Sequence, residues 1–337
     1  MSQFQNAGTF DAGVFTSSMT GISNNTFTMD EAGIASGGAF LRSELEKRDP
    51  LIRKPLSSFT YPRDITINVG GGWADSVSAM SVAYGITGGN GAVHAGGANG
   101  VPIVSASVDN GIYKAHLFAA ALRVMFVDMQ RANYIGRSLD QLLTDGVRMA
   151  YDKHMDQNVY IGLEEYGTTG LLNNPDAEET IVATGTGGST KWTDKTPDEI
   201  LGDVNAALIE TWEAAGYDTS AMPNHILLPY EQYTSLLTRK VTDLASKTIL
   251  DFLMENNAAA KNGGHVFIGA TRWCKGAGTD GMDRMVVYNN DQRFVTMDEL
   301  VPLSKIMTGP NTANVCYDTA YMANISEVQV MYPQTIR

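Results

Sequence analysis

The sequence is short of the residues that disulfides, metal sites and covalent active sites need. Its 337 residues include two cysteines, Cys274 and Cys316, and five histidines. The cysteines lie far apart and have no His or Cys neighbour at ligand spacing, so we expect two reduced thiols. The histidines form no HExxH motif and no paired spacing, which predicts no metal site. They are His94, His116, His154, His225 and His265.

Long apolar runs are also missing. No stretch approaches the ~20 apolar residues of a membrane-spanning helix. The first residues have neither the basic segment nor the apolar core of a secretory signal. With reduced cysteines, this pattern predicts a soluble cytosolic product.

Basic residues are outnumbered by acidic ones. There are 24 Lys and Arg against 37 Asp and Glu, a formal net charge of −13. Nucleic-acid recognition needs clustered Lys and Arg against phosphates, so it is not expected as the main task. The composition is still compatible with a wall around DNA, for which weak adhesion is an advantage.

Catalytic motifs are absent as well. There is no GxSxG elbow. Glu164 and Glu165 beside Tyr166 could form an acid–base pair, but adjacent residues after a helix end are more often a solvated turn. The glycine-rich stretch 88–100 could be a phosphate loop, yet that needs a glycine turn opening a helix, and a strand is expected here. We therefore predict no catalytic, cofactor-binding or metal-binding residues, no cofactor and no enzymatic activity.

Two residue types that are plentiful indicate packing rather than chemistry. Many of the 16 methionines fall within apolar patterns, which is typical of core or interface packing. The 34 glycines cluster in the first third and favour irregular arms over one compact unit.

The most informative stretch runs from Tyr134 to Pro175. Ser138 and Gln141 have the spacing of a capping box, and the apolar face that follows continues without proline to Ile161. This predicts a helix over 138–161, roughly 35 Å long. Gly162 ends it, and a turn-rich segment closes with the sequence GLLNNP at residues 170–175.

This long capped helix and its GLLNNP turn resemble the spine helix and following turn of tailed-phage major capsid proteins of the Hong Kong 97-type fold, which encapsulin shells share. The resemblance implies an α+β fold with an N-terminal arm, an extended β loop, a peripheral domain containing the spine helix, and an axial α/β domain. It places the N-terminal arm at 1–60 and the start of the peripheral domain at 61–115, with the extended loop at about 70–110. The part of the peripheral domain that contains the spine helix (about 138–161) is placed at 116–195. The axial domain is placed at 196–296, and the C-terminal return to the peripheral domain at 297–337.

Patterns elsewhere in the chain predict the remaining elements. Residues 1–60 are weakly patterned, with one short helix expected at Ala39–Lys47. The segment Ile112–Met129 is left open between strand and helix. Thr196 and Glu199 form a second capping box, which opens a helix that ends at Gly216. The other expected helices are Tyr230–Leu237 and Thr242–Asn256. The expected strands are Ile65–Val69, Trp73–Ile86, Val101–Val108, His225–Pro229, Val266–Gly269, Arg284–Tyr288, Asn314–Met322 and Ile325–Met331. The last two strands are expected to form an antiparallel pair joined near Asn324.

The resemblance implies a structural protein: a phage major capsid protein that self-assembles through hexamers and pentamers into an icosahedral virion shell around packaged double-stranded DNA. Its expected partners are other copies of itself, with separate scaffolding, portal and cement proteins, and assembly is expected in the bacterial host cytoplasm without a membrane. No lysine lies between Trp73 and Tyr113, so we expect no covalent cross-link through a lysine of the extended loop. Two alternatives remain: an encapsulin-type nanocompartment shell, and an α/β enzyme with a glycine-rich lid.

Overall fold

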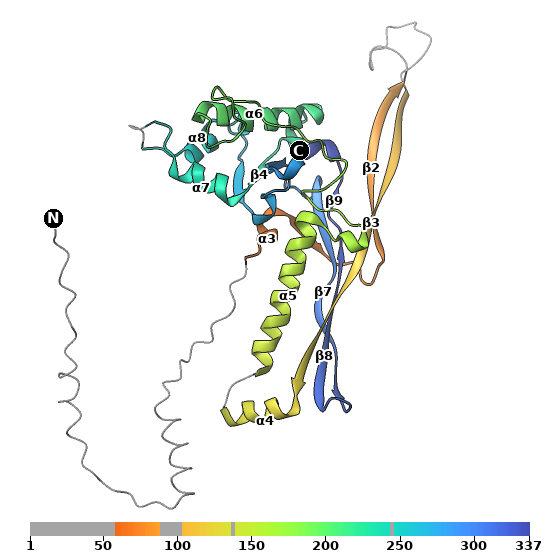
Figure 1. Ribbon diagram of the computed structural model, residues 1–337. Coiled ribbons are helices and arrows are strands. Elements are labelled where there is room, and N and C mark those ends of the chain that lie inside the picture. Colours follow the sequence, from red (N-terminus) through yellow and green to blue (C-terminus); the bar gives the residue numbers. More distant parts are fainter. Residues whose placement is uncertain (1–57, 88–102, 136–138, 243–245) are drawn as a thin grey trace, which may run out of the picture. The chain divides into compact units, whose positions relative to one another are not determined.

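The structure, a computed structural model, describes residues 58–87, 103–135, 139–242 and 246–337 (Figure 1). Contacts divide the chain into Met1–Leu56 and Ser57–Arg337, and every element below belongs to the second unit. The expected helix at 39–47, the glycine-rich tip and the Ser138 cap lie outside the described residues. Among the described residues, no helix is long and apolar enough to cross a membrane.

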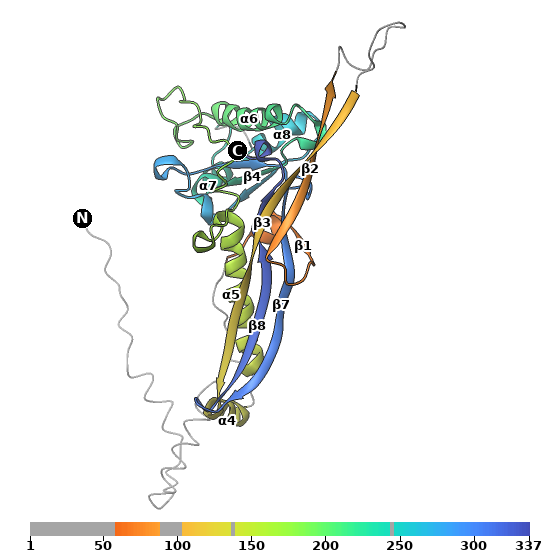
Figure 2. The same ribbon diagram turned by 90° about the vertical axis from the view of Figure 1, so that its right-hand side faces the viewer.

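A six-stranded sheet forms the larger layer, in the order β1-β7-β8-β3-β2 with β9 added beside β7 (Figure 2). Strand β1 runs parallel to β7, and all other neighbours are antiparallel. The strands are β1 Thr66–Val69, β2 Ser76–Thr87, β3 Ile103–Met125, β7 Val295–Asn311, β8 Cys316–Ser326 and β9 Gln329–Val330.

Strand β3 settles the segment that the sequence left open. It continues as one strand through Met125, and helix α4 (Phe126–Ile135), which was not predicted, follows directly. The first half of β3 pairs with β2 as far as Lys114 opposite Ser76. From Ala115 opposite Ser326, its second half pairs with β8. The β2–β3 hairpin is therefore a two-stranded extension of the larger sheet.

The predicted pairing of the two C-terminal strands is wrong: β8 pairs with β7 and β3, and β9 pairs with β7. Strands β7 and β8 are joined at residues 312–315, and Asn324 lies inside β8 opposite Leu117. Asn324 reads as a turn residue, but its side-chain amide is buried and donates to the carbonyls of Gly72 (3.2 Å) and Ala74 (2.9 Å). These tertiary hydrogen bonds override the local turn preference.

Helix α5 (Leu139–Ile161) confirms the predicted long helix and covers one face of the larger sheet (Figures 1 and 2). Its buried side chains include Tyr151, Met155 and Val159, which share one core with β7 and β8 residues such as Met297 and Ile325. That apolar contact, more than intrinsic propensity, stabilises a helix of this kind.

The smaller sheet has the order β5-β4-β6, with β4 (His225–Leu228) parallel to β5 (Phe267–Ala270) and antiparallel to β6 (Val286–Tyr288). Its helices are α6 (Pro197–Ala214), α7 (Tyr230–Thr238), α8 (Ile249–Asn256) and α9 (Ala258–Lys261). The predicted capping box is confirmed: Thr196 Oγ1 accepts from the Glu199 N–H, and a Glu199 carboxylate oxygen accepts from the Thr196 N–H.

Helix α8 begins seven residues later than its predicted start at Thr242. Thr248 caps it through a box with Asp251 and also forms a bridge with Lys240. Besides helix α3 (Tyr61–Asp64), the short elements are the 3-10 turns η1 Glu164–Tyr166, η2 Thr219–Ala221, η3 Arg272–Cys274, η4 Thr279–Gly281 and η5 Pro333–Thr335.

Candidate assembly interface

One face of the β2–β3 hairpin is apolar and open to solvent. The register places Met80 opposite Asn110, Val82 opposite Val108 and Tyr84 opposite Ala106, and directly opposed residues share a face. Met80 and Tyr84 are 74% and 76% exposed, and Val108 and Ile112 on the same face are also exposed. The alternation predicted for β2 is therefore confirmed, with the large apolar side chains pointing to solvent. A contiguous exposed apolar face of this kind marks an interaction surface.

A second exposed apolar group lies at the far end of the larger sheet. There the end of β3, the start of α4 and the turn between β7 and β8 come together, and the Phe126 N–H donates to the Val315 carbonyl over 3.2 Å (Figure 1). A bidentate ion pair between Arg123 and Asp318 joins the strands there at 2.7 and 2.9 Å. The exposed apolar residues at this end are Met125, Phe126, Val127, Met307, Val315 and Tyr317.

The GLLNNP turn folds back onto the C-terminal end of α5. The Leu171 and Leu172 N–H groups donate to the carbonyls of Val159 and Tyr160, each over 2.9 Å, and both leucine side chains are buried. Asn173 completes the turn: its Oδ1 accepts from the Gly170 N–H and its Nδ2 donates to the Ile161 carbonyl, each over 2.7 Å. The motif thus supplies the capping groups that the helix end lacks.

Helix α3 is held by two buried carboxylates. Asp64 is fully buried and accepts from Arg63 Nε (2.6 Å) and Nη2 (2.8 Å) and from the Tyr160 hydroxyl of α5. Asp156 of α5 accepts from the Thr60 N–H at 2.8 Å and, on its other oxygen, from Trp273 Nε1 at 2.7 Å. These contacts tie α3 to the spine-like helix and to η3.

Opposing effects act on the pKa of Asp64. Burial raises it, while the surrounding donors His225, Arg63 and Tyr160 lower it and prevail. His225 Nε2 lies 3.5 Å from Asp64 Oδ1 and makes no hydrogen bond of good geometry. We therefore attribute the lowering to Arg63 and Tyr160, whose donors are close and well directed.

We expect Asp64→Asn to lower the free energy of unfolding at pH 7 by about 2 kcal/mol, because the charge-assisted hydrogen bonds are lost. A carboxyl with a lowered folded-state pKa stabilises the fold above its unfolded value of 3.8 and loses that contribution as the pH falls. Urea denaturation at pH 7 and pH 3.5 measures the free energy of unfolding at each pH. The decrease due to protonation of Asp64 should be present in the wild type and absent from the variant. The exposed Asp75→Asn is the control, and an equal loss in both variants would contradict the assignment.

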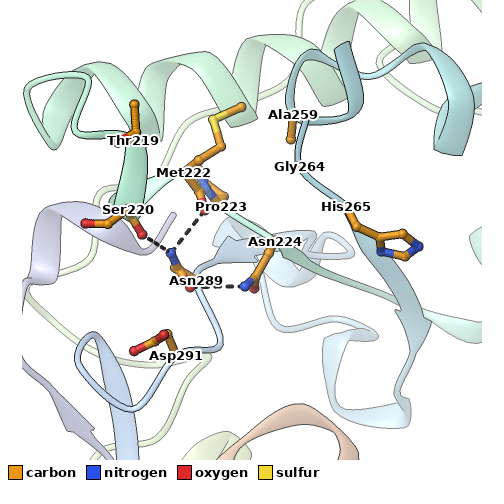
Figure 3. Close-up of a pocket in the computed structure, with 10 residues that line it drawn as sticks. All are labelled: Thr219, Ser220, Met222, Pro223, Asn224, Ala259, Gly264, His265, Asn289 and Asp291. Carbon is orange, nitrogen blue, oxygen red and sulfur yellow. Dashed lines mark hydrogen bonds between the residues drawn. The ribbon is translucent and has the colours of Figure 1, made fainter. Parts of the chain in front are cut away.

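A pocket lies beside η2 in the smaller-sheet region, and two asparagines of its lining are hydrogen-bonded within the protein (Figure 3). Asn289 Nδ2 donates to the carbonyls of Ser220 (2.8 Å) and Met222 (3.1 Å), and Asn224 Nδ2 donates to Asn289 Oδ1 (3.1 Å). Hydrogen bonding to Arg293 lowers the pKa of Asp291, at the edge of the pocket. These hydrogen bonds hold the loops around η2 together.

The structure places the other candidate residues as follows. Glu164 and Glu165 are exposed in η1, as expected of a solvated turn. Cys274 and Cys316 are buried free thiols. Met155 is fully buried, whereas Met125 is exposed. No group of three or more His, Cys, Asp or Glu side chains suited to a metal ion occurs within the described part of the chain. The sequence pattern gives no sign of the Asp64 and Asp156 anchors, because each depends on contacts between residues about 100 positions apart.

Comparison with known proteins identifies the same architecture. The structure superimposes on the capsid of Myoviridae phage XM1 with a TM-score of 0.70 at 16% identity, covering 88% of this chain and 96% of that one. The match to Microbacterium phage Oxtober96 has a TM-score of 0.56 at 14% identity (89% and 93% covered), and that to the capsid of a native GTA particle 0.57 at 15% (90% and 96%). No protein with curated annotation matches the sequence.

These likenesses confirm the α+β capsid fold of the Hong Kong 97 type. The profile of the family described as "Major capsid protein" matches residues 89–337, about three quarters of the sequence. The chain belongs to the major capsid protein family. Its role is therefore structural, as a self-assembling component of a phage capsid, and its location is the capsid of the virion.

Proposed function

We propose that many copies of this chain, arranged as hexamers and pentamers, form an icosahedral shell that encloses packaged double-stranded DNA. The observation that carries the proposal is the exposed apolar face of the β2–β3 hairpin, together with membership of the major capsid protein family. Interface energy comes from burial and shape, so a shell subunit needs such faces and no reactive groups. Accordingly, we propose that the protein is not an enzyme.

The proposal assigns parts of the chain to assembly roles. Residues 1–60 act as an arm and the hairpin at about 70–110 as the extended loop over a neighbouring copy. The larger sheet and α5 act as the peripheral domain, and 196–296 acts as the axial domain around the symmetry axes. Scaffolding, portal and cement proteins are separate chains, assembly takes place in the host cytoplasm, and DNA is enclosed without sequence-specific contacts. Since no lysine lies between Trp73 and Tyr113, the extended loop makes no covalent cross-link through a lysine.

Negative-stain electron microscopy with light scattering of the purified chain tests the proposal. Closed shells, or rings of five or six copies, are expected. A chain that stays monomeric at high concentration and with its scaffolding protein would overturn it.

A charge on the hairpin's apolar face should weaken assembly without unfolding the subunit. Tyr84→Asp removes roughly 2 kcal/mol of apolar burial per contact, which raises the concentration required for assembly about thirtyfold. Because Tyr84 is exposed in the isolated subunit, the thermal unfolding midpoint of the subunit should change little. Ser105→Asp, on the opposite face of the same hairpin, is the matched control. Equal assembly of Tyr84→Asp and wild type would remove this face from the interface.

A further inference from the structure

Strand β3 and helix α5 meet at a pair of histidine rings. His116 Nε2 and His154 Nε2 lie 3.3 Å apart, although the two residues are 38 positions apart in the sequence. His116 is only 7% exposed, and its ring stacks on Tyr166 with centroids 5.7 Å apart. The His154 ring lies against Phe118, with centroids 5.1 Å apart. The scattered spacing of the histidines gave no sign of this pair.

Hydrogen bonding fixes which nitrogen carries each proton. A neutral imidazole has one donor and one acceptor nitrogen. His116 Nδ1 is buried and has no hydrogen-bond partner. A buried N–H without an acceptor is costly, so Nδ1 is assigned as the unprotonated nitrogen. His116 Nε2–H then donates to His154 Nε2, and in this arrangement both rings are neutral.

The pair also occupies a mechanically important position. Lys114 is the last β3 residue paired with β2, and pairing with β8 begins at Ala115. His116 therefore lies at the base of the β2–β3 hairpin, where the hairpin leaves the larger sheet. Its contact with His154 holds this base against α5.

Several ionisable groups on the elements around the pair are bonded elsewhere, and Glu164 and Glu165 of η1, next to Tyr166, are exposed to solvent. Lys114 Nζ donates to the Gly167 carbonyl at 3.2 Å. The Glu327 carboxylate, just beyond β8, accepts from the Lys114 N–H at 2.8 Å. On the other sides, Tyr151 of α5 donates to Glu299 of β7, and Asp152 and Asp156 of α5 accept from residues at α3. Within the described residues, no carboxylate is hydrogen-bonded to either ring, so a proton added to the pair has no counter-ion in contact.

We propose that His116 and His154 form a proton-operated latch, which when neutral holds the base of the β2–β3 hairpin against α5 and when protonated releases it. A proton on His154 Nε2 would face the His116 Nε2–H, two donors at hydrogen-bond distance. A proton on His116 Nδ1 would be a buried donor and a buried charge without a partner. The first event breaks the hydrogen bond between the rings. The second keeps that hydrogen bond but leaves a buried N–H and a buried charge without a partner, which favours the released state.

The direction of the pH dependence follows from the site. Burial, aided by His154, lowers the pKa of His116 from 6.5 to about 4, and burial also lowers the pKa of His154. A folded-state pKa below the unfolded value means that the latch is fully stabilised above pH 6.5 and weakens as the pH falls. For His116 alone, the opening equilibrium should increase about thirtyfold between pH 7.5 and pH 5.0.

Hydrogen–deuterium exchange of the full-length protein, in whatever assembly it forms, tests the latch. Peptides covering residues 111–122 of β3 and 147–161 of α5 should lose protection about thirtyfold at pH 5.0, after correction for intrinsic exchange, while peptides of α6 keep theirs. This pH lies above 3.8, so Asp64 stays ionised in both conditions.

The double variant His116→Phe/His154→Gln should lose this pH response, because Phe keeps the ring contacts and neither residue titrates. His265→Gln, which removes an exposed histidine outside the pair, should respond as wild type does. Equal losses in the double variant and wild type would overturn the latch. If the double variant does not fold, the wild type alone decides: unchanged protection of both peptides at pH 5.0 would also overturn it. Neither result depends on shell formation, so it is separable from the proposed function.

Discussion

Replacing Gly170 with alanine is expected to lower the free energy of unfolding by about 4 kcal/mol or to prevent folding at 37 °C. A Cβ at this position would lie 2.5 Å from the carbonyl carbon of Tyr160 and 2.6 Å from the Ile161 nitrogen. Both are backbone atoms of the last turn of α5, so no change of rotamer can relieve the clash. The turn must move away from the helix.

That movement breaks the rest of the turn. The hydrogen bonds from Leu171 and Leu172 to the end of α5 would be lost, and both side chains, now at most 2% exposed, would leave the core. Re-exposing each leucine costs about 2 kcal/mol, which accounts for the expected magnitude.

A second glycine of the same helix supplies the control. Gly146 is an exposed position inside α5 where a Cβ meets nothing within 4 Å. Gly146→Ala should therefore stabilise the protein by about 0.5–1 kcal/mol through helix propensity. Chemical denaturation of both variants measures the difference, with soluble yield at two temperatures as the readout if Gly170→Ala does not fold. A Gly170→Ala protein within 1 kcal/mol of wild type would contradict the packing described for this turn.

How much of the molecule could be predicted from sequence depends on the distance over which its determinants act. The capping box of Thr196 and Glu199 and the helix up to Ile161 are confirmed, because their signals lie within one or two turns of the chain. The GLLNNP turn was recognisable for the same reason.

Non-local contacts account for what was missed. The change of partner along β3, from β2 to β8, leaves no local mark, so this segment stayed open between strand and helix. Asn324 has a turn residue's chemistry, but distant carbonyls satisfy its amide. The Asp64 anchor and the His116–His154 contact likewise join segments that only tertiary structure brings together.

Lys195→Met should produce a comparable loss, about 3–5 kcal/mol, by leaving a buried charge unpaired. The Lys195 and Asp203 side chains are 1% and 5% exposed, and Nζ lies 2.5 Å from Asp203 Oδ2. Nζ also donates to the Ala183 carbonyl at 2.5 Å, and Trp192 Nε1 donates to the same Asp203 oxygen at 2.9 Å. The irregular segment before α6 is thus attached to that helix through one ion pair.

Substitutions of Lys195 and Asp203 should have strongly non-additive effects on the free energy of unfolding. Such non-additivity distinguishes an ion pair from ordinary packing. In Lys195→Met/Asp203→Asn no buried charge remains, and the Asn carbonyl oxygen can still accept from Trp192, so the loss should shrink to about 1–2 kcal/mol. Lys191→Met removes an exposed lysine of the same segment and should stay within about 0.5 kcal/mol of wild type. Urea denaturation of the four proteins gives these free energies. If the double variant is instead no more stable than Lys195→Met, the loss comes from the missing methylene packing and hydrogen bond of Lys195. The unpaired charge of Asp203 would then not be its cause.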